Sequence, residues 1–421
     1  MRIIEYITFD DVVIVPRKAP VDPQYVVLES NITSNHRISV PILSSPMDTV
    51  TEQDLAIEIA RLGGVGVIHR NISISKQADM IRNVKNASPD FKHLFDTINI
   101  NKLDKSNLRL DKPLIITSDS SPIGVYIPTS ILSPALAEKI DIVLRLLGTG
   151  LVKPSLDNNG KLLVGAAISP FDIKRAEAIE KAGADFLVTD VAHLHNVEAL
   201  SALKKLAEKV SIDIVAGNIG TKEAVLDILT MVENISGLRV GISSGSICST
   251  GVVAGASVPT LTAVMNAREA LEELGLFGRI PIIADGGIRG PGEAAKAIVA
   301  GASAVMSGRL FAGTDEAPSL LVRIGDKLYK TYRGMASAGA MKRRHAADRY
   351  SRPSKQLEEG VEGLVPYEGP LVKVMSRMFF GLQASLGYAG ASRIEEAWNG
   401  ILARVSLLGA KEINPHDLVK L

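Results

Sequence analysis

The residue most able to do covalent chemistry is Cys248, the only cysteine of the 421-residue chain. It lies in the Gly/Ser-rich segment 241–250, directly after the apolar run 238–242, which predicts a β-strand. Loops at the carboxyl ends of strands are where α/β enzymes place their reactive groups. A lone cysteine is more often a small buried hydrophobe, but hydroxyl side chains precede and follow this one. We therefore interpret Cys248 as a candidate nucleophile.

Other predicted strands also end in polar residues or glycines. Three of them end at Ser45, Asp190 and Asn218, and two later ones end at Asp285-Gly286-Gly287 and at Gly308-Arg309. Glycine-rich ends of the last two strands of a barrel commonly bind phosphate through backbone N–H groups. A carboxylate such as that of Asp285 suits ribose hydroxyls. Together these residues indicate a ribose monophosphate site.

A second ligand is expected near Asp190 and Asn218, across the mouth from the phosphate residues. His193 and His195 are two residues apart, a spacing that fits loop residues better than a metal site. No metal-ligand pattern stands out in the sequence.

The elements that position these residues alternate regularly. Short β-branched runs alternate with amphipathic helical segments, a pattern that predicts a (β/α)₈ TIM barrel. A doubly wound sheet is the alternative on periodicity alone. The eight predicted strands are residues 40–45, 64–69, 162–168, 185–190, 213–218, 238–242, 281–286 and 304–308.

Two segments break this regularity. Residues 88–157 form an insertion between the second and third strands, and its segment 112–126 predicts a small β-hairpin. The barrel is thus predicted from residues 1–87 and 158–421. Within the second part, residues of about 340–363 include a polar run that is either a solvated loop or a mobile flap.

Composition excludes several classes of protein. The net charge of +1 gives no field that would recruit nucleic acid or an anionic membrane. The amino terminus lacks the apolar core of a signal peptide, and no apolar run reaches the roughly 20 residues that span a bilayer. A single cysteine excludes an internal disulfide and fits a reducing compartment. We expect a cytoplasmic protein with a small-molecule substrate.

Several longer motifs resemble the IMP dehydrogenase/GMP reductase family. Thr8-Phe-Asp-Asp-Val-Val-Ile-Val-Pro16, Ser45-Pro-Met-Asp-Thr-Val-Thr-Glu52 and Gly63-Gly-Val-Gly-Val-Ile-His69 resemble its opening. Gly245-Ser-Ile-Cys-Ser-Thr250, Ile283-Ala-Asp-Gly-Gly287 and Tyr332-Arg-Gly-Met335 resemble its nucleotide site. The resemblance covers residues 1–87 and about 160–421, and it implies a purine ribonucleoside monophosphate as substrate.

The resemblance also implies individual roles. Cys248 would attack C2 of the purine base, and Thr250 matches the catalytic threonine of the family. Asp190 and Asn218 match positions on the cofactor side. Substrate-binding positions would be Ser45, Met47, Ser246, Asp285, Gly286, Gly287, Gly308, Arg309, Tyr332, Gly334, Met335 and Glu359.

The flap separates the two activities of this family. Dehydrogenases carry an Arg-Tyr pair that activates water for hydrolysis of a thioimidate, and Arg349-Tyr350 matches it. The resemblance therefore favours a dehydrogenase that converts IMP to XMP with NAD. A GMP reductase, which uses NADPH and releases ammonia, is the alternative. A nucleotide-binding regulator that has lost catalysis is a third possibility, prompted by the departures below.

Four positions depart from the pattern of the family: Ser243, Gly251, Thr260 and Arg309. Arg309 replaces a serine and would put a guanidinium on the phosphate. Ser243 replaces a glycine of the loop that, with Gly245 and Cys248, coordinates a monovalent cation in the family, which argues against activation by K⁺. Relatives often carry paired CBS repeats at the insertion, so residues 88–157 are interpreted as a reduced CBS-like module. A homotetramer is implied by the family.

Overall fold

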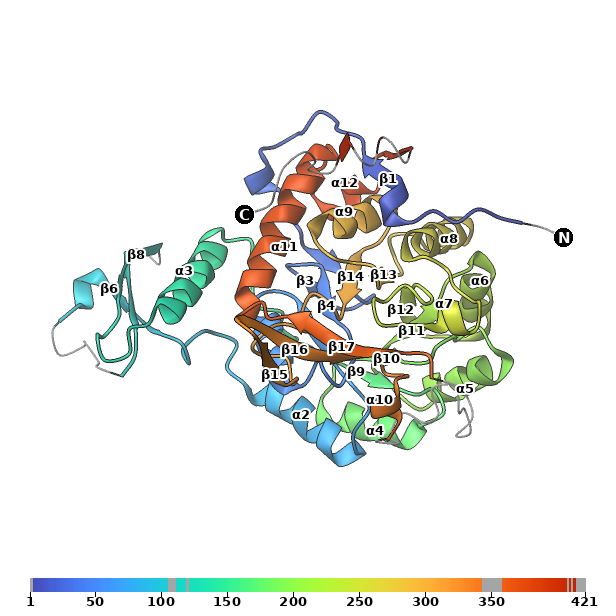
Figure 1. Ribbon diagram of the computed structural model, residues 1–421, viewed down its shortest axis with the longest axis horizontal. Helices are drawn as coiled ribbons and strands as arrows, with labels where there is room; N and C mark the ends of the chain where they lie inside the picture. The colour runs from blue at the N-terminus through green and yellow to red at the C-terminus, as the bar shows by residue number, and fades with distance from the viewer. Residues whose placement is uncertain are drawn as a thin grey trace.

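The computed structural model describes residues 3–104, 111–118, 121–342, 358–406, 409 and 412–413. Eight parallel strands close into a barrel at its centre (Figure 1). The predicted (β/α)₈ barrel is confirmed and the doubly wound sheet is wrong. Around the barrel the strands are β4 (Ile42–Ser44), β5 (Val65–Ile68), β9 (Val164–Ile168), β10 (Phe186–Thr189), β11 (Asp213–Ile219), β12 (Ile235–Val240), β13 (Ile282–Asp285) and β14 (Ala304–Ser307).

Helices cover the outside of the barrel and follow the strands along the chain. Their amphipathic faces bury alanine, leucine and isoleucine against strands that are themselves buried on both faces, as parallel sheets require. Asp172, Asn196 and Thr221 cap three of them by accepting backbone N–H groups. The helices are α1 (Gln53–Arg61), α2 (Ile74–Asn86), α4 (Ile173–Ala182), α5 (Val197–Ala207), α6 (Lys222–Met231), α8 (Thr260–Glu273), α9 (Pro291–Ala300) and α11 (Leu371–Tyr388).

The barrel interior is filled by side chains, and its amino-terminal end is closed by a hairpin of β2 (Ser30–Asn31) and β3 (Arg37–Ile38). Ile32 and Ile38 from this hairpin join the interior cluster that contains Phe186. Beside them, Asp213 at the start of β11 accepts hydrogen bonds from the hairpin loop. This closed end leaves the carboxyl-terminal end of the strands as the accessible one.

The insertion projects from the side of the barrel (Figure 1). It contains β6 (Asp96–Asn99), η3 (Ile100–Lys102), β7 (Leu114–Ser118), β8 (Ser121–Tyr126) and α3 (Pro134–Gly148). Strands β7 and β8 are antiparallel, which confirms the predicted hairpin. Lys139 on α3 reaches the barrel, with Nζ 3.3 Å from Glu58 and 3.4 Å from Glu316. The CBS-like interpretation stays a prediction.

Between β14 and α11 the chain forms a second small sheet at the mouth of the barrel. Its antiparallel strands are β15 (Leu321–Ile324), β16 (Lys327–Arg333) and β17 (Glu362–Pro366), with α10 (Ala338–Lys342) after β16. This sheet carries Tyr332, and the residues after β16 and before β17 reach the Cys248 loop.

Two segments that lie far apart in the sequence pair beside the barrel. Strand β1 (Val12–Ile14) pairs antiparallel with β18 (Leu402–Arg404), and η1 (Phe9–Asp11) immediately precedes β1. The remaining short helices are η2 (Pro23–Tyr25), α7 (Thr250–Val253) and α12 (Ile394–Ala397). Among the described residues, every helix is too short or too polar to cross a lipid bilayer.

Candidate active site

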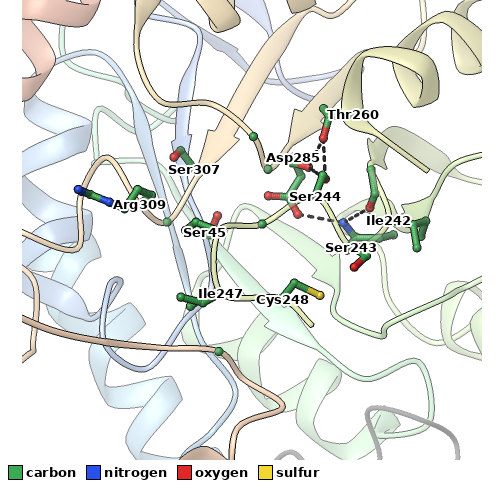
Figure 2. Close-up of a pocket in the computed structure, with 18 of the residues that line it drawn as sticks. Ser45, Ile242, Ser243, Ser244, Ile247, Cys248, Thr260, Asp285, Ser307 and Arg309 are labelled. Carbon is green, nitrogen blue, oxygen red and sulfur yellow. Dashed lines mark hydrogen bonds between the residues drawn. The ribbon is translucent and has the colours of Figure 1, made fainter. Parts of the chain in front are cut away.

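The carboxyl-terminal ends of the barrel strands surround a cavity of about 520 Å³, a volume that suits a nucleotide-sized ligand. Figure 2 shows Ser307 and Arg309 on one side of this cavity, Cys248 and Ser243 on the other, and Ser45 between them. The predicted site residues that the structure describes lie near the ends of barrel strands, on the Cys248 loop, on β16 or on the segment between β16 and β17. The lining includes Ser45, Met47, Asp190, Asn218, Ser246, Cys248, Thr250, Asp285, Gly286, Gly287, Gly308, Arg309, Tyr332, Gly334, Met335 and Glu359.

Cys248 is exposed on the loop between β12 and α7, as predicted. Its backbone N–H donates to the carbonyl of Gly245 at 3.1 Å, which closes a tight turn before the thiol. The loop also pairs with the segment before β17, through a bridge between Cys248 and Gly360. Gly334 lies against this contact, since a Cβ there would be 3.0 Å from the carbonyl oxygen of Ile247.

Thr250 and Glu359 continue from the thiol in a line of contacts. The Sγ of Cys248 is 3.3 Å from Oγ1 of Thr250, and that hydroxyl donates to Oε2 of Glu359 at 3.0 Å. Glu359 is 2% exposed, so its carboxylate faces the loop instead of solvent. A threonine hydroxyl has one proton. Because Thr250 gives that proton to Glu359, its oxygen is an acceptor toward the cysteine.

Asp285 lies at the centre of a charged network that the sequence reasoning only partly anticipated. Its Oδ2 accepts Nδ2 of Asn218 at 2.9 Å and Nε of Arg239 at 2.8 Å. Arg239, from inside β12, also approaches Asp190 at 3.5 Å, and Arg70 lies 3.5 Å from the other oxygen of Asp190. The network thus balances two carboxylates against two guanidinium groups, which fixes the orientation of Asp285.

Neither Arg239 nor Arg70 was among the predicted site residues. The signal for Arg239 was a charged residue inside the apolar run 238–242, since a charge in a buried strand requires a partner. Asp190 was predicted to face a second ligand, and it is 1% exposed between the two arginines. Val191 and Ala192, next along the chain, line the same edge of the cavity.

The predicted phosphate residues occupy the end of the cavity near β13 and β14. Gly286 and Gly287 have φ of 92° and 72°, the left-handed region that favours glycine. At Gly308 a Cβ would be 2.6 Å from the sulfur of Met47 and 2.8 Å from Oη of Tyr332, so only glycine fits. Arg309 lines the same end of the cavity, close enough for its charge to act on Tyr332.

Tyr332 closes this end of the cavity and is 4% exposed. Burial raises the pKa of Tyr332 to about 12, although a hydrogen bond with Ser246 and the charge of Arg309 oppose the rise. The phenol is therefore neutral over the whole working range of pH and can donate to an anion.

Met335 is held beside Met47 at the mouth. Its sulfur accepts the backbone N–H of Asp48 at 3.4 Å, and Asp48 is paired with Arg333 at 2.6 Å. Hydrogen bonds from Arg333 and Asn71 hold the pKa of the Asp48 carboxyl below its usual range, in spite of its burial. The two sulfurs give the cavity an apolar, adaptable wall that suits a flat ring.

Arg349 and Tyr350 of the predicted flap lie outside the described residues. Sequence reasoning also missed Ser244, whose hydroxyl donates to the carbonyl of Asp285 at 3.1 Å. Thr260 appeared in the sequence analysis only as a departure from the family pattern. Its hydroxyl lies 2.7 Å from the Ser244 hydroxyl and 2.9 Å from the carbonyl oxygen of Asp285.

The residues of the Cys248 loop are restrained by hydrogen bonds within the loop. The carbonyl of Gly245 accepts the N–H of Cys248, and Ser243, in the left-handed region with φ of 58°, uses its hydroxyl to accept the N–H of Gly251. The loop is shaped by its own hydrogen bonds.

Comparisons with known proteins agree on one family. Residues 6–416 match the IMP dehydrogenase / GMP reductase domain. The inosine-5'-monophosphate dehydrogenase of Korarchaeum cryptofilum is 42% identical over 98% of this chain and 96% of its own length, and that of Thermoplasma acidophilum is 41% identical over 99% and 95%. Among solved structures, GMP reductase from Trypanosoma brucei in complex with guanosine 5'-monophosphate is similar, with a TM-score of 0.78, 30% identity and 99% of both chains covered.

Proposed function

The chain belongs to the IMP dehydrogenase / GMP reductase family, and from this premise we propose that it oxidises inosine 5'-monophosphate (IMP) to xanthosine 5'-monophosphate (XMP). NAD supplies the hydride acceptor when it is bound. IMP, NAD⁺ and water give XMP, NADH and a proton. The observation that carries the proposal is the contact line from the exposed Cys248 through Thr250 to the buried Glu359.

The nucleotide is held in the proposed complex by groups at both ends of the cavity. Asp285, fixed by Arg239 and Asn218, accepts ribose hydroxyls. The phosphate binds at the β13 and β14 ends, where neutral Tyr332 donates one hydrogen bond and Arg309 supplies a positive charge. Ser45, Ser246, Gly286, Gly287 and Gly308 contribute the remaining polar or close backbone contacts.

The base then lies between Met47 and Met335 with its C2 atom toward Cys248. The sulfur adds to C2 as the C2=N3 double bond opens and its electron pair moves to N3, and the proton of the thiol passes to Thr250 as that hydroxyl gives its own proton to Glu359. With NAD bound, hydride would leave C2 for it as the electron pair on N3 re-forms the double bond, and a thioimidate would remain on Cys248. Water would then add to C2 and cleavage of the C–S bond would release XMP. The sulfur would recover its proton from Glu359 through Thr250, and one proton would be released.

Hydrolysis requires a group that activates water, and we assign this role to Arg349 with Tyr350 on the flap. Asp190 and Asn218 mark the side of the cavity assigned to NAD. The protein is proposed to act as a homotetramer, which light scattering of the purified protein tests directly.

GMP reductase activity is the second candidate, favoured by the likeness over 99% of both chains to a solved GMP reductase. Absorbance at 340 nm separates the two. A rise with IMP and NAD supports the proposal, whereas a fall with GMP and NADPH and no rise with IMP overturns it. Nucleotide binding without turnover in either direction would instead favour a regulator that has lost catalysis.

Arg349→Ala tests the hydrolytic step. We expect one rapid burst of NADH for each active site, followed by turnover slowed at least 100-fold, because the adduct forms but is not hydrolysed. Arg323→Ala, on the exposed strand β15, is the matched control and should behave as the parent protein. Equal loss of the burst and of steady turnover would refute the assignment of Arg349.

A further inference from the structure

Ser243 adopts a backbone conformation that side chains rarely take. Its φ of 58° lies in the left-handed region, where every residue except glycine is disfavoured by contact between Cβ and the backbone. Among the described residues only Asn234 shares this property. Ser243 lies five positions before Cys248, so the disfavoured conformation is at the start of the loop that carries the thiol.

A hydrogen bond made by the side chain of Ser243 offsets the cost of its backbone conformation. Its Oγ accepts the backbone N–H of Gly251 at 2.7 Å. Gly251 is the second residue of α7, and an N–H in a first helical turn has no partner inside the helix. The bond therefore joins the two ends of the segment 243–251, and Cys248 and Thr250 both lie between them.

Gly251 is matched to this bond. A Cβ at position 251 would lie 3.2 Å from the Ser243 oxygen and 3.5 Å from the Cβ of Ser257, so a larger residue would crowd the bond. The departures from the family pattern at Ser243 and Gly251 are therefore coupled: the serine supplies the hydrogen bond, and the glycine leaves room for it.

A second pair of hydroxyls fixes the base of the same loop. Ser244 donates to the carbonyl of Asp285 at 3.1 Å, and Thr260 lies 2.7 Å from the Ser244 oxygen (Figure 2). Backbone bonds between Ile242 and Val258 close the loop below them. Above this base, the Ser243–Gly251 bond joins the two ends of the segment, and the bridge to Gly360 restrains its middle.

We propose that Ser243 is a positioning residue for Cys248: its hydroxyl, bonded to Gly251, holds the loop so that the thiol stays beside Thr250 without a bound monovalent cation. The inference rests on the proposed role of Cys248 as the nucleophile. It goes beyond the proposed reaction because it assigns the shape of the loop to one side chain and predicts how the enzyme responds to ions.

Ser243→Gly is the cleanest perturbation, because glycine adopts a φ of 58° freely and only the hydroxyl is lost. We expect kcat for IMP oxidation to fall about tenfold or more while KM for IMP stays within about twofold, since the thiol is misplaced but the nucleotide contacts remain. Ser249→Gly is the matched control: it removes a hydroxyl and adds the same chain freedom on the same loop, and Ser249 makes no side-chain cap bond to α7.

Alkylation of the thiol gives a readout that does not depend on turnover. Because Cys248 is the only cysteine, every iodoacetamide adduct found by intact mass reports on it. We expect Ser243→Gly to react at least about threefold faster than the parent, because Sγ is released from Thr250, and Ser249→Gly to react at the parental rate. Parental alkylation by Ser243→Gly, or an equal change in both variants, overturns the proposal even if the protein proves to be a reductase.

The parent protein supplies a test that no folding defect can obscure. Turnover and alkylation are measured in KCl and in tetramethylammonium chloride at equal ionic strength. Both rates should agree within about twofold, because no cation is needed to stabilise the competent loop. Stimulation by K⁺ of tenfold or more, in either rate, would show that a cation shapes the loop and would overturn the proposal.

Discussion

Replacing Asp213 by asparagine should weaken the closed end of the barrel and leave the active site intact. Asp213 accepts hydrogen bonds from Thr33 at 2.5 Å, Asn35 at 2.7 Å, His36 at 3.0 Å and Ser236 at 3.0 Å. Although burial acts to raise it, these donors lower the pKa of Asp213 to about 2. The side chain is 8% exposed, so solvent does little to screen the effect.

The size of the effect follows from linkage. The pKa of Asp213 falls from 3.8 in the unfolded chain to about 2 in the folded protein. At about 1.4 kcal/mol for each pH unit, the ionised group contributes about 2 kcal/mol. Because the folded pKa is the lower one, this contribution is complete above pH 4 and is lost as the pH falls toward 2.

Urea unfolding, followed by circular dichroism at pH 7, 5 and 3, measures the contribution of ionised Asp213 to the free energy of unfolding. The free energy of unfolding of Asp213→Asn should lie about 2 kcal/mol below that of the parent at pH 7 and pH 5, and about half as far below it at pH 3. Asp79→Asn, whose side chain is 63% exposed and pairs with Arg82, should cost less than about 0.5 kcal/mol at every pH. A difference for Asp213→Asn that does not change with pH would refute the reasoning, because the ionised carboxylate would then contribute nothing.

Three other substitutions have distinct expected results. Asp285→Asn should raise KM for IMP by about 10- to 100-fold in steady-state kinetics, because a charged acceptor for ribose is lost and Arg239 loses one of its two carboxylate partners. Tyr332→Phe should raise KM for IMP about fivefold, and the ratio of this KM to that of the parent should be the same at every pH up to 10 because the pKa of Tyr332 is about 12. Lys139→Met removes the cation between the buried Glu58 and the partly buried Glu316, and it should lower the free energy of unfolding by about 1–3 kcal/mol. Lys373→Met, whose partner is exposed, should lower it by less than about 1 kcal/mol. An unchanged KM for either site variant, or equal losses for the two lysine variants, would contradict these assignments.

The barrel was predictable because its signal is local. Buried parallel strands need continuous β-branched runs, and strand ends that converge bring Ser45, Asp285 and Cys248 together in any arrangement of this type. The spacing of the motifs then sufficed to place most of the lining residues.

The rest depended on contacts between distant residues. Arg239 binds Asp285 across 46 positions, and Thr250 reaches Glu359 across 109, so no window of sequence reveals either pair. The departures at Ser243 and Gly251 were visible in the sequence, but only the folded loop shows that they form one hydrogen bond. Pairing of polar groups, unlike periodicity, is decided by tertiary structure.

The pairing of β1 with β18 has a consequence for how the protein is made. Residues 8–10, which line the cavity, lie just before a strand whose partner, residues 402–404, follows all eight barrel strands in the sequence. The successive strand–helix units can form during synthesis before residues 402–404 are added, but until then β1 has no partner and η1 is not held against the cavity. The wall of the cavity that η1 provides is therefore completed later than the barrel itself.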